Sequence, residues 1–101
     1  MMTDKQLVAF TLAFRKGILG RDPSAMRCFM VCAPLAPLLR RSGVVADLVE
    51  SSYNGCNHFW LRLSDGRVLD PTADQFPGLG LPPVYLGPPA APHRTPKAPR
   101  R

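Results

Sequence analysis

A cysteine, a histidine and an aspartate stand in this sequence in the order that a nucleophilic thiol site needs. Cys28 falls near the expected start of a helix, His58 lies on an expected strand, and Asp70 ends the next strand. In such a site the histidine activates the thiol and a third group orients the histidine. A thiol at a helix N-terminus beside an imidazole also has a lowered pKa, which makes a thiolate available near neutral pH. We therefore take Cys28, His58 and Asp70 as candidate catalytic residues.

The turn between the two strands decides whether His58 and Asp70 can meet. A two-residue turn would place Asp70 opposite Leu61 and point it away from His58. A three-residue loop with a left-handed Gly66 instead places Leu69 opposite Leu61, and it brings Asp70 to the His58 face. We favour the second register because it pairs leucine with leucine. It also leaves the Cα atoms of the two site residues about 7–8 Å apart, within reach of a hydrogen bond.

Three further residues are expected to line the site. Trp60, two positions after His58, is expected in the core or as a wall of the site. Asn57 and Gln75 are candidate hydrogen-bond donors, and the sequence does not choose between them. The Cys28 backbone amide is one expected oxyanion donor, and the second donor is unassigned.

The motifs that carry these residues resemble the transglutaminase-like, papain-related cysteine enzymes. They are Cys28, the helix end Leu38-Leu39-Arg40-Arg41-Ser42-Gly43-Val44, the strand Asn57-His58-Phe59-Trp60, and Leu69-Asp70-Pro71-Thr72. The resemblance covers residues 26–76, about half of the chain, and its ending is similar to small phage and bacterial members. It implies an α+β fold of the cysteine-proteinase type, with a cysteine-bearing helix packed on a small antiparallel sheet.

The resemblance also implies a reaction: thiol attack on an amide, an acyl-enzyme, and resolution as hydrolysis, deamidation or transfer. A protein or peptide substrate is expected, and no cofactor. Two alternatives stay open. One is a non-catalytic binding protein on the same scaffold. The other is a structural zinc site, since Cys28, Cys32, Cys56 and His58 are four ligands of the type that zinc prefers.

Composition limits the other function classes. A chain of 101 residues that is 46% hydrophobic is expected to form one domain. Apolar stretches are too short to span a membrane, no secretory signal is evident, and three cysteines suggest free thiols, so a cytoplasmic location is expected. The net charge is +6, but four of the 13 basic residues lie after residue 93, and 9 then remain against 7 acidic ones. Nucleic acid is therefore not the expected partner.

The periodicity predicts the elements that must position the site. A second helix containing Pro34 and Pro37 is expected to be kinked near Ala33. Residues 1–87 are expected to form the domain, and the proline-rich, basic residues 88–101 a flexible tail. The sequence Pro82-Pro83-Val84-Tyr85 matches a WW-domain ligand, although an edge strand is favoured. The expected elements are helices at 4–19 and 24–42, strands at 44–50, 56–63 and 67–70, and a packed arm at 77–87.

Overall fold

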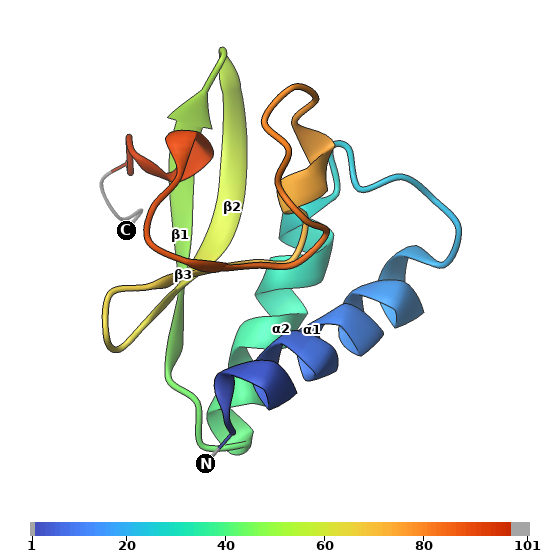
Figure 1. The fold of residues 1–101 in the computed structure, drawn as a ribbon, viewed down its shortest axis with the longest axis vertical. Helices are drawn as coiled ribbons and strands as arrows, with labels where there is room; N and C mark the ends of the chain where they lie inside the picture. The colour runs from blue at the N-terminus through green and yellow to red at the C-terminus, as the bar shows by residue number, and fades with distance from the viewer. Residues whose placement is uncertain (1, 98–101) are drawn as a thin grey trace.

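The computed structural model describes residues 2–97, which form an α+β domain of two helices and a four-stranded antiparallel sheet (Figure 1). The sheet order is β1-β2-β3-β4. Within the described residues, neither helix is long and apolar enough to cross a membrane. The elements are α1 (Asp4–Leu19), α2 (Cys28–Arg41), β1 (Ala46–Tyr53), β2 (Cys56–Leu63), β3 (Val68–Asp70) and β4 (Tyr85–Gly87), with 3-10 turns η1 (Ala73–Gln75) and η2 (Ala91–His93).

Helix α1 has the predicted bounds, and its N-cap is Thr3. The Thr3 hydroxyl accepts from the Gln6 backbone amide, and the Gln6 side chain accepts in return from the Thr3 amide. This reciprocal capping box satisfies two amides that the first helical turn leaves without partners. Asp4 instead forms an ion pair with Arg67, which ties the start of α1 to the β2–β3 loop.

Helix α2 begins at Cys28, four residues later than predicted. The Arg27 amide donates to the Ser24 carbonyl, 3.1 Å away, in a turn that precedes the helix. Pro34 and Pro37, for which a kink near Ala33 was expected, both lie inside one continuous helix. Both prolines lie on the exposed side of the helix, away from the core residues of α2.

The two turns of the sheet set the register that the site needs. Asn54 and Gly55 both have positive φ, and they join β1 to β2 in a two-residue hairpin that extends β1 beyond the predicted 44–50. Gly66 has φ of 87°, and Leu61 pairs with Leu69. The preferred register is therefore confirmed, with the left-handed glycine at its expected place.

The two faces of the sheet have different coverings. On the α2 side, Leu61, Leu63 and Leu69 join residues of both helices in the core, which comprises Leu7, Cys32, Leu35, Leu39, Ala46, Leu61, Leu63, Leu69 and Val84. On the other face, Trp60 lies against His93 of η2. The alternation of side chains along β2 puts His58 on the Trp60 face.

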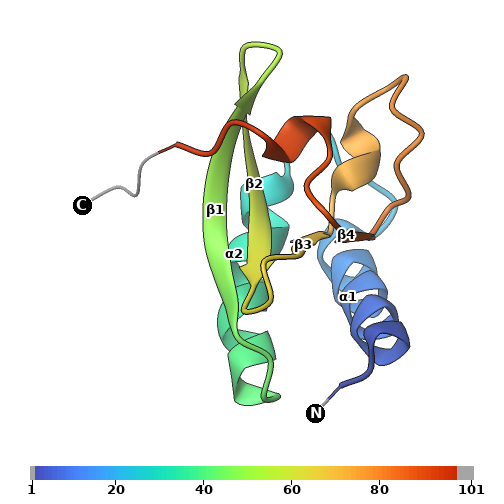
Figure 2. The ribbon, with the colours of Figure 1, turned by 60° about the vertical axis from the view of Figure 1, so that its left-hand side comes forward.

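Residues 88–97, called here the C-terminal strap, pack on the sheet instead of forming a flexible tail. The Ser52 amide donates to the Thr95 carbonyl, and the Lys97 amide donates to the Glu50 carbonyl. Figure 2 shows the strap crossing from β4 to the outer side of β1. Buried Pro92 and His93, both in the 3-10 turn η2, anchor the strap. The expected tail residues 98–101 lie outside the described residues.

Candidate functional site

Cys28 lies at the open side of β2, where β3 has turned away. Strand β3 pairs with β2 only at Leu61 and Arg62, so the next outward-facing backbone groups have no strand partner. Two cysteines of α2 occupy this gap. The Phe59 amide donates to the Cys28 Sγ at 3.5 Å, and the Cys32 Sγ donates to the Phe59 carbonyl at 3.4 Å. The nucleophile candidate is thus positioned by the end of the strand pairing.

The N-terminus of α2 presents its positive end to Cys28 without a competing anion. Arg27 is the cap residue and makes no side-chain cap hydrogen bond, and the first turn contains no acidic residue. The first amides of a helix have no intrahelical acceptor, and the helix dipole favours negative charge at this end. A thiolate or an oxyanion beside Cys28 could therefore accept hydrogen bonds from the first amides of α2, because no carboxylate of the first turn competes for them.

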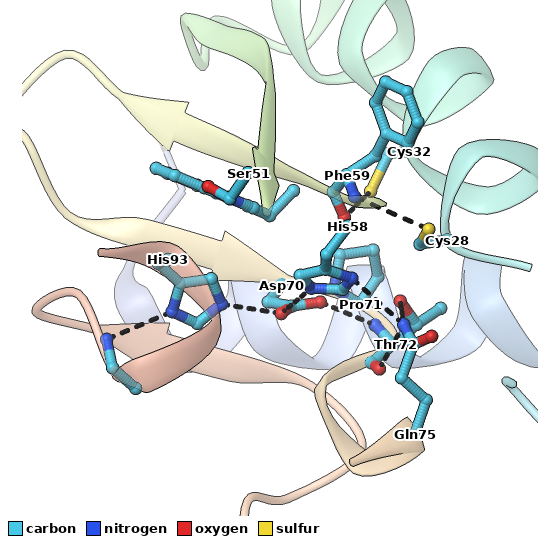
Figure 3. Close-up of polar contacts among 12 residues, drawn as sticks. Cys28, Cys32, Ser51, His58, Phe59, Asp70, Pro71, Thr72, Gln75 and His93 are labelled. Atoms are coloured by element: carbon cyan, nitrogen blue, oxygen red, sulfur yellow. Dashed lines mark hydrogen bonds and ion pairs between the residues drawn. The ribbon is translucent and has the colours of Figure 1, made fainter. Parts of the chain in front are cut away.

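His58 and Asp70 form a buried pair across the β2–β3 junction (Figure 3). The His58 Nε2 and the Asp70 Oδ2 lie 2.6 Å apart, and both side chains are almost fully buried. The other carboxylate oxygen, Oδ1, accepts from the Thr72 amide at 3.0 Å. Pro71 has no amide hydrogen, so the Asp-Pro-Thr sequence leaves Thr72 as the donor that holds the carboxylate.

The pKa values of the three residues favour an ion pair between thiolate and imidazolium. Burial lowers the pKa of His58, but hydrogen bonds and charges of Asp70 and Cys28 outweigh it and raise this pKa to about 9. Burial raises the pKa of Cys28, but interactions with His58 and the Phe59 amide outweigh it, so the net pKa is lowered. Burial also opposes ionisation of Asp70, yet hydrogen bonds from two imidazoles hold its pKa below the ordinary value.

Gln75 contacts Nδ1 of His58, the ring nitrogen that does not face Asp70. Its Nε2 is 3.1 Å from His58 Nδ1, 3.1 Å from the Thr72 carbonyl and 3.0 Å from the Thr72 hydroxyl. The Phe76 ring packs edge-on against His58 at 4.7 Å between centroids. The Gln75 amide can donate to Nδ1 only while that nitrogen is unprotonated, so this contact belongs to the neutral imidazole.

Helix α1 fixes the segment that carries Gln75. The Arg15 guanidinium binds Asp74 with two hydrogen bonds of 2.7 and 2.8 Å, and it also donates to the carbonyl of Pro71 at 3.1 Å. The Ser24 hydroxyl donates to the same carboxylate at 2.7 Å. Burial acts against ionisation of Asp74, but Arg15 and Ser24 lower its pKa overall. Ser24, at the predicted start of the second helix, therefore binds this carboxylate and does not cap α2.

His93 is the site residue that sequence reasoning missed. Its Nε2 lies 2.7 Å from Asp70 Oδ2, the same oxygen that His58 contacts, and its side chain is fully buried. The ring packs at 5.1 Å from the Trp60 ring and is stacked on the Tyr85 ring at 5.7 Å. The one available signal was that the chain has only two histidines, the second within the segment expected to be a tail.

The other two predicted lining residues have different roles. Asn57 is exposed, and its side-chain oxygen accepts from the Lys97 ammonium group. Adjacent strand residues point to opposite faces, so Asn57 lies away from the His58 side of β2. Trp60 is buried, its ring N–H donates to Ser51 Oγ at 2.8 Å, and it forms a wall against His93.

No protein-family model matches this chain. No curated protein or solved structure shows significant similarity to it either. The chemistry open to the site is therefore argued from its own geometry.

Among the described residues, the one group of three or more potential metal ligands within 4.8 Å consists of His58, Asp70 and His93. The expected zinc set does not come together, because Cys56 is exposed while Cys32 is buried against Phe59. Hydrogen bonding also disfavours a metal at the observed group. A histidine that binds a metal through Nε2 carries its proton on Nδ1, whereas the His93 Nδ1 accepts from the Ala90 amide at 3.1 Å.

Proposed function

We propose that this chain is a cysteine enzyme of the transglutaminase-like, papain-related kind that transfers the acyl group of an amide. The observation that carries this proposal is that the His58 imidazole interacts with both Asp70 and Cys28. His58 lies 2.6 Å from Asp70, and its interaction with Cys28 lowers the pKa of the thiol while raising its own. This is the arrangement that a thiolate nucleophile with an oriented general acid and base requires.

The proposed reaction proceeds in two halves. The Cys28 thiolate attacks the amide carbonyl carbon, and the carbonyl oxygen takes the electron pair. The His58 imidazolium then gives its proton to the leaving amine as the carbon–nitrogen bond breaks, which leaves a thioester. In the second half His58 removes a proton from water or an amine, which attacks the thioester and restores the thiolate. Asp70 stays ionised throughout and stabilises the His58 imidazolium in each half of the reaction in which it forms.

Two donors are available for the oxyanion of the tetrahedral intermediate. The Cys28 backbone amide belongs to the first turn of α2, where amides have no intrahelical partner. The second proposed donor is the Gln75 amide group, because protonation of His58 Nδ1 removes its acceptor there. This assigns Gln75 a role that the sequence left open between Gln75 and Asn57.

The surface beside Cys28 suits a protein or peptide substrate with apolar side chains. Met26, Phe29 and Met30 surround the start of α2 and are 87%, 53% and 52% exposed. Met26 also has a φ of 63°, which is costly for a residue other than glycine and is often found beside functional sites. Two hollows elsewhere on the molecule are lined by residues of α1 and of the segments near β4, and neither contains Cys28.

The proposed fold assignment is a reduced cysteine-proteinase core, in which α2 packs on the β1–β2 hairpin and supplies the nucleophile. Three free cysteines suit a reducing compartment, and we propose a cytoplasmic location for that reason. The small size of the domain leaves few loops for specificity. A folded protein substrate would then supply part of the binding surface.

Iodoacetamide labelling across pH 5–9, followed by mass spectrometry of each cysteine, tests the thiolate. We expect Cys28 to react faster than exposed Cys56 at pH 6–7, where an ordinary thiol is largely protonated. Cys32 serves as an internal control, because burial raises its pKa well above the ordinary value. Equal rates and pH profiles at Cys28 and Cys56 would rule out the enzyme.

A non-catalytic binding protein is the second candidate, and the exposed apolar residues beside Cys28 favour it as much as they favour a substrate surface. An electrophilic amide-mimicking probe separates the two. The enzyme forms a covalent adduct that disappears in Cys28→Ser and persists in Cys56→Ser. A pure binding protein forms no such adduct, and its Cys28→Ser variant retains partner binding.

A further inference from the structure

The hydrogen bonds of His93 fix where its proton lies. The Ala90 backbone amide donates to Nδ1 at 3.1 Å, so this nitrogen presents a lone pair. A backbone N–H group can only donate a hydrogen bond. Its partner Nδ1 must therefore be the acceptor, and it carries no proton. The proton of the neutral ring is therefore on Nε2, which points at Asp70 Oδ2 from 2.7 Å. His93 is a donor to the carboxylate.

Asp70 consequently receives three hydrogen bonds while fully buried. The Thr72 amide donates to Oδ1, and the two imidazoles of His58 and His93 both donate to Oδ2. A buried carboxylate remains ionised only when such donors compensate for its lost hydration. Of the three, His93 is the one contributed by the C-terminal strap.

We propose that His93 is a positioning residue of the site, which holds the Asp70 carboxylate ionised and aimed at His58, so that the strap completes a Cys28–His58–Asp70–His93 tetrad. The proposal rests on the thiol chemistry proposed above. His93 acts through Asp70 and is separated from the reacting atoms by that carboxylate and by His58.

The surroundings of His93 hold it in this role. Tyr85 stacks on one side of its ring, Trp60 packs edge-on, and the ring is fully buried. Strap residues on the far side of η2 bind β1 through the amides of Ser52 and Lys97. The ring therefore cannot turn away from Asp70 unless the strap is displaced. If Asp70 lost this donor, the carboxylate would be free either to rotate or to take up a proton, and in both cases the His58 imidazolium would lose support.

Nitrogen NMR of the histidine rings tests the proton positions in the unmodified full-length chain. With only two histidines, ¹⁵N-histidine labelling gives two ring systems, assigned with the variant His93→Gln. At pH 7 we expect one ring with protons on both nitrogens, from His58, and one with a proton on Nε2 alone, from His93. A His93 ring protonated on Nδ1 would overturn the proposal. Zinc chloride that shifts both Nε2 signals would replace the tetrad with a metal site.

Two substitutions at His93 test whether the donor matters to the thiol. His93→Leu removes it, whereas His93→Gln keeps an N–H donor at a similar reach. We expect Cys28 alkylation at pH 6.5 to slow at least about tenfold in His93→Leu, because a charged group loses a hydrogen bond, and to recover most of its rate in His93→Gln. Circular dichroism establishes that each variant is folded, and the NMR measurement stands if His93→Leu is not.

The outcomes separate the two proposals. Fast alkylation of Cys28 that is unchanged in folded His93→Leu rejects the tetrad and leaves the enzyme. Slow alkylation of Cys28 in the unmodified chain rejects the enzyme and, with it, the tetrad. Equal slowing in His93→Leu and His93→Gln reduces His93 to a packing role and also overturns the proposal.

Discussion

Burial and the charges of its partners shift the pKa of His58 in opposite directions. The effect of the partners is larger, so the pKa is raised. Burial alone would keep the ring neutral, whereas Asp70 and Cys28 together raise its pKa from 6.5 to about 9. The proton on His58 at neutral pH therefore depends on both neighbours. A change at either neighbour is measurable at the ring itself.

Cys28→Ser should lower the pKa of His58 from about 9, because serine stays neutral and cannot pair with the imidazolium. NMR titration of the ring between pH 5 and 10 measures this directly. The matched control is Cys32→Ser, which removes a sulfur that contacts the Phe59 carbonyl rather than the imidazole. An unchanged His58 titration in Cys28→Ser would show that the thiol does not interact with the ring.

The sequence predicted residue positions where spacing and strand alternation were both available. The order of Cys28, His58 and Asp70 and the leucine pairing placed the last two on one face of the sheet, as observed. Asn57, one of two candidate donors in the sequence analysis, is exposed and accepts from Lys97, as its place next to His58 on one strand suggests. His93 could not be predicted, because its partner is distant in the chain and no periodicity marks its segment.

Among the elements, α1 matters to the site through a single side chain. Arg15 joins α1 to the carbonyls of Pro71 and Pro83 and to the carboxylate of Asp74. These contacts fix the segment that follows Asp70 and ends in Gln75. The helix therefore supports the position of the site from outside the sheet.

Arg15→Met should reduce the free energy of unfolding by roughly 1–3 kcal/mol, because it removes the guanidinium from two carbonyls and from a partly buried carboxylate, which then keeps only the Ser24 hydroxyl. Urea denaturation measures the loss. Arg40→Met is the matched control, since the Arg40–Asp47 pair is exposed and longer, at 3.4 Å. Similar losses in the two variants would show that the Asp74 clamp is no stronger than a surface ion pair.

Element boundaries were predictable where one local signal dominated. Helix α1 follows its apolar spacing, and the β2–β3 loop follows Gly66. The Asn54-Gly55 pair is an equally strong hairpin signal, but the predicted strand ended at residue 50 and left the pair in a loop. The late start of α2 was not predictable, because Ser24 has a good capping side chain that a distant carboxylate, Asp74, takes instead.

For the whole molecule, the pair of His58 and Cys28 predicts a pH range over which the free energy of unfolding is nearly constant. The His58 pKa is raised to about 9 on folding, so its contribution is complete below pH 6.5 and lost as pH rises through about 9. The Cys28 pKa is lowered from 9.0, so its contribution is present above pH 9.0 and lost as pH falls through the folded-state pKa. Above both pH 6.5 and the folded-state pKa of Cys28, and below pH 9, the unfolded chain holds one proton on Cys28 and the folded chain one on His58, so the two dependences cancel.

From the folded-state pKa of Cys28, read from its alkylation profile, up to pH 9, urea denaturation should therefore show a nearly constant contribution of this pair to the free energy of unfolding. On the acid side the pKa of Asp70 lies below its ordinary value of 3.8, so its contribution is present above pH 3.8 and lost as pH falls further. Asp70→Asn should show a shallower acid decline. A steady fall in stability from pH 7 to 9 would mean that His58 is protonated without a compensating Cys28 thiolate.

The strap predicts a result opposite to that expected from composition alone. Deleting residues 88–101 removes buried Pro92 and His93 and uncovers Trp60, so we expect the melting temperature to fall by at least about 5 °C. Arg94→Ala, at an exposed strap position, is the control and should leave the temperature unchanged. If the deletion also left it unchanged, the strap would be the free tail that its proline content suggested.

The hydrogen bonds between the strap and β1 have a consequence for molecules in which the strap opens. They cover the outer edge of β1 at residues 50–52, and an uncovered strand edge readily pairs with another chain. A molecule whose strap has opened thus loses the His93 donor and gains a self-associating edge in the same event. Molecules with an opened strap would then be removed from solution as aggregates, so the folded population would consist of molecules with the strap in place.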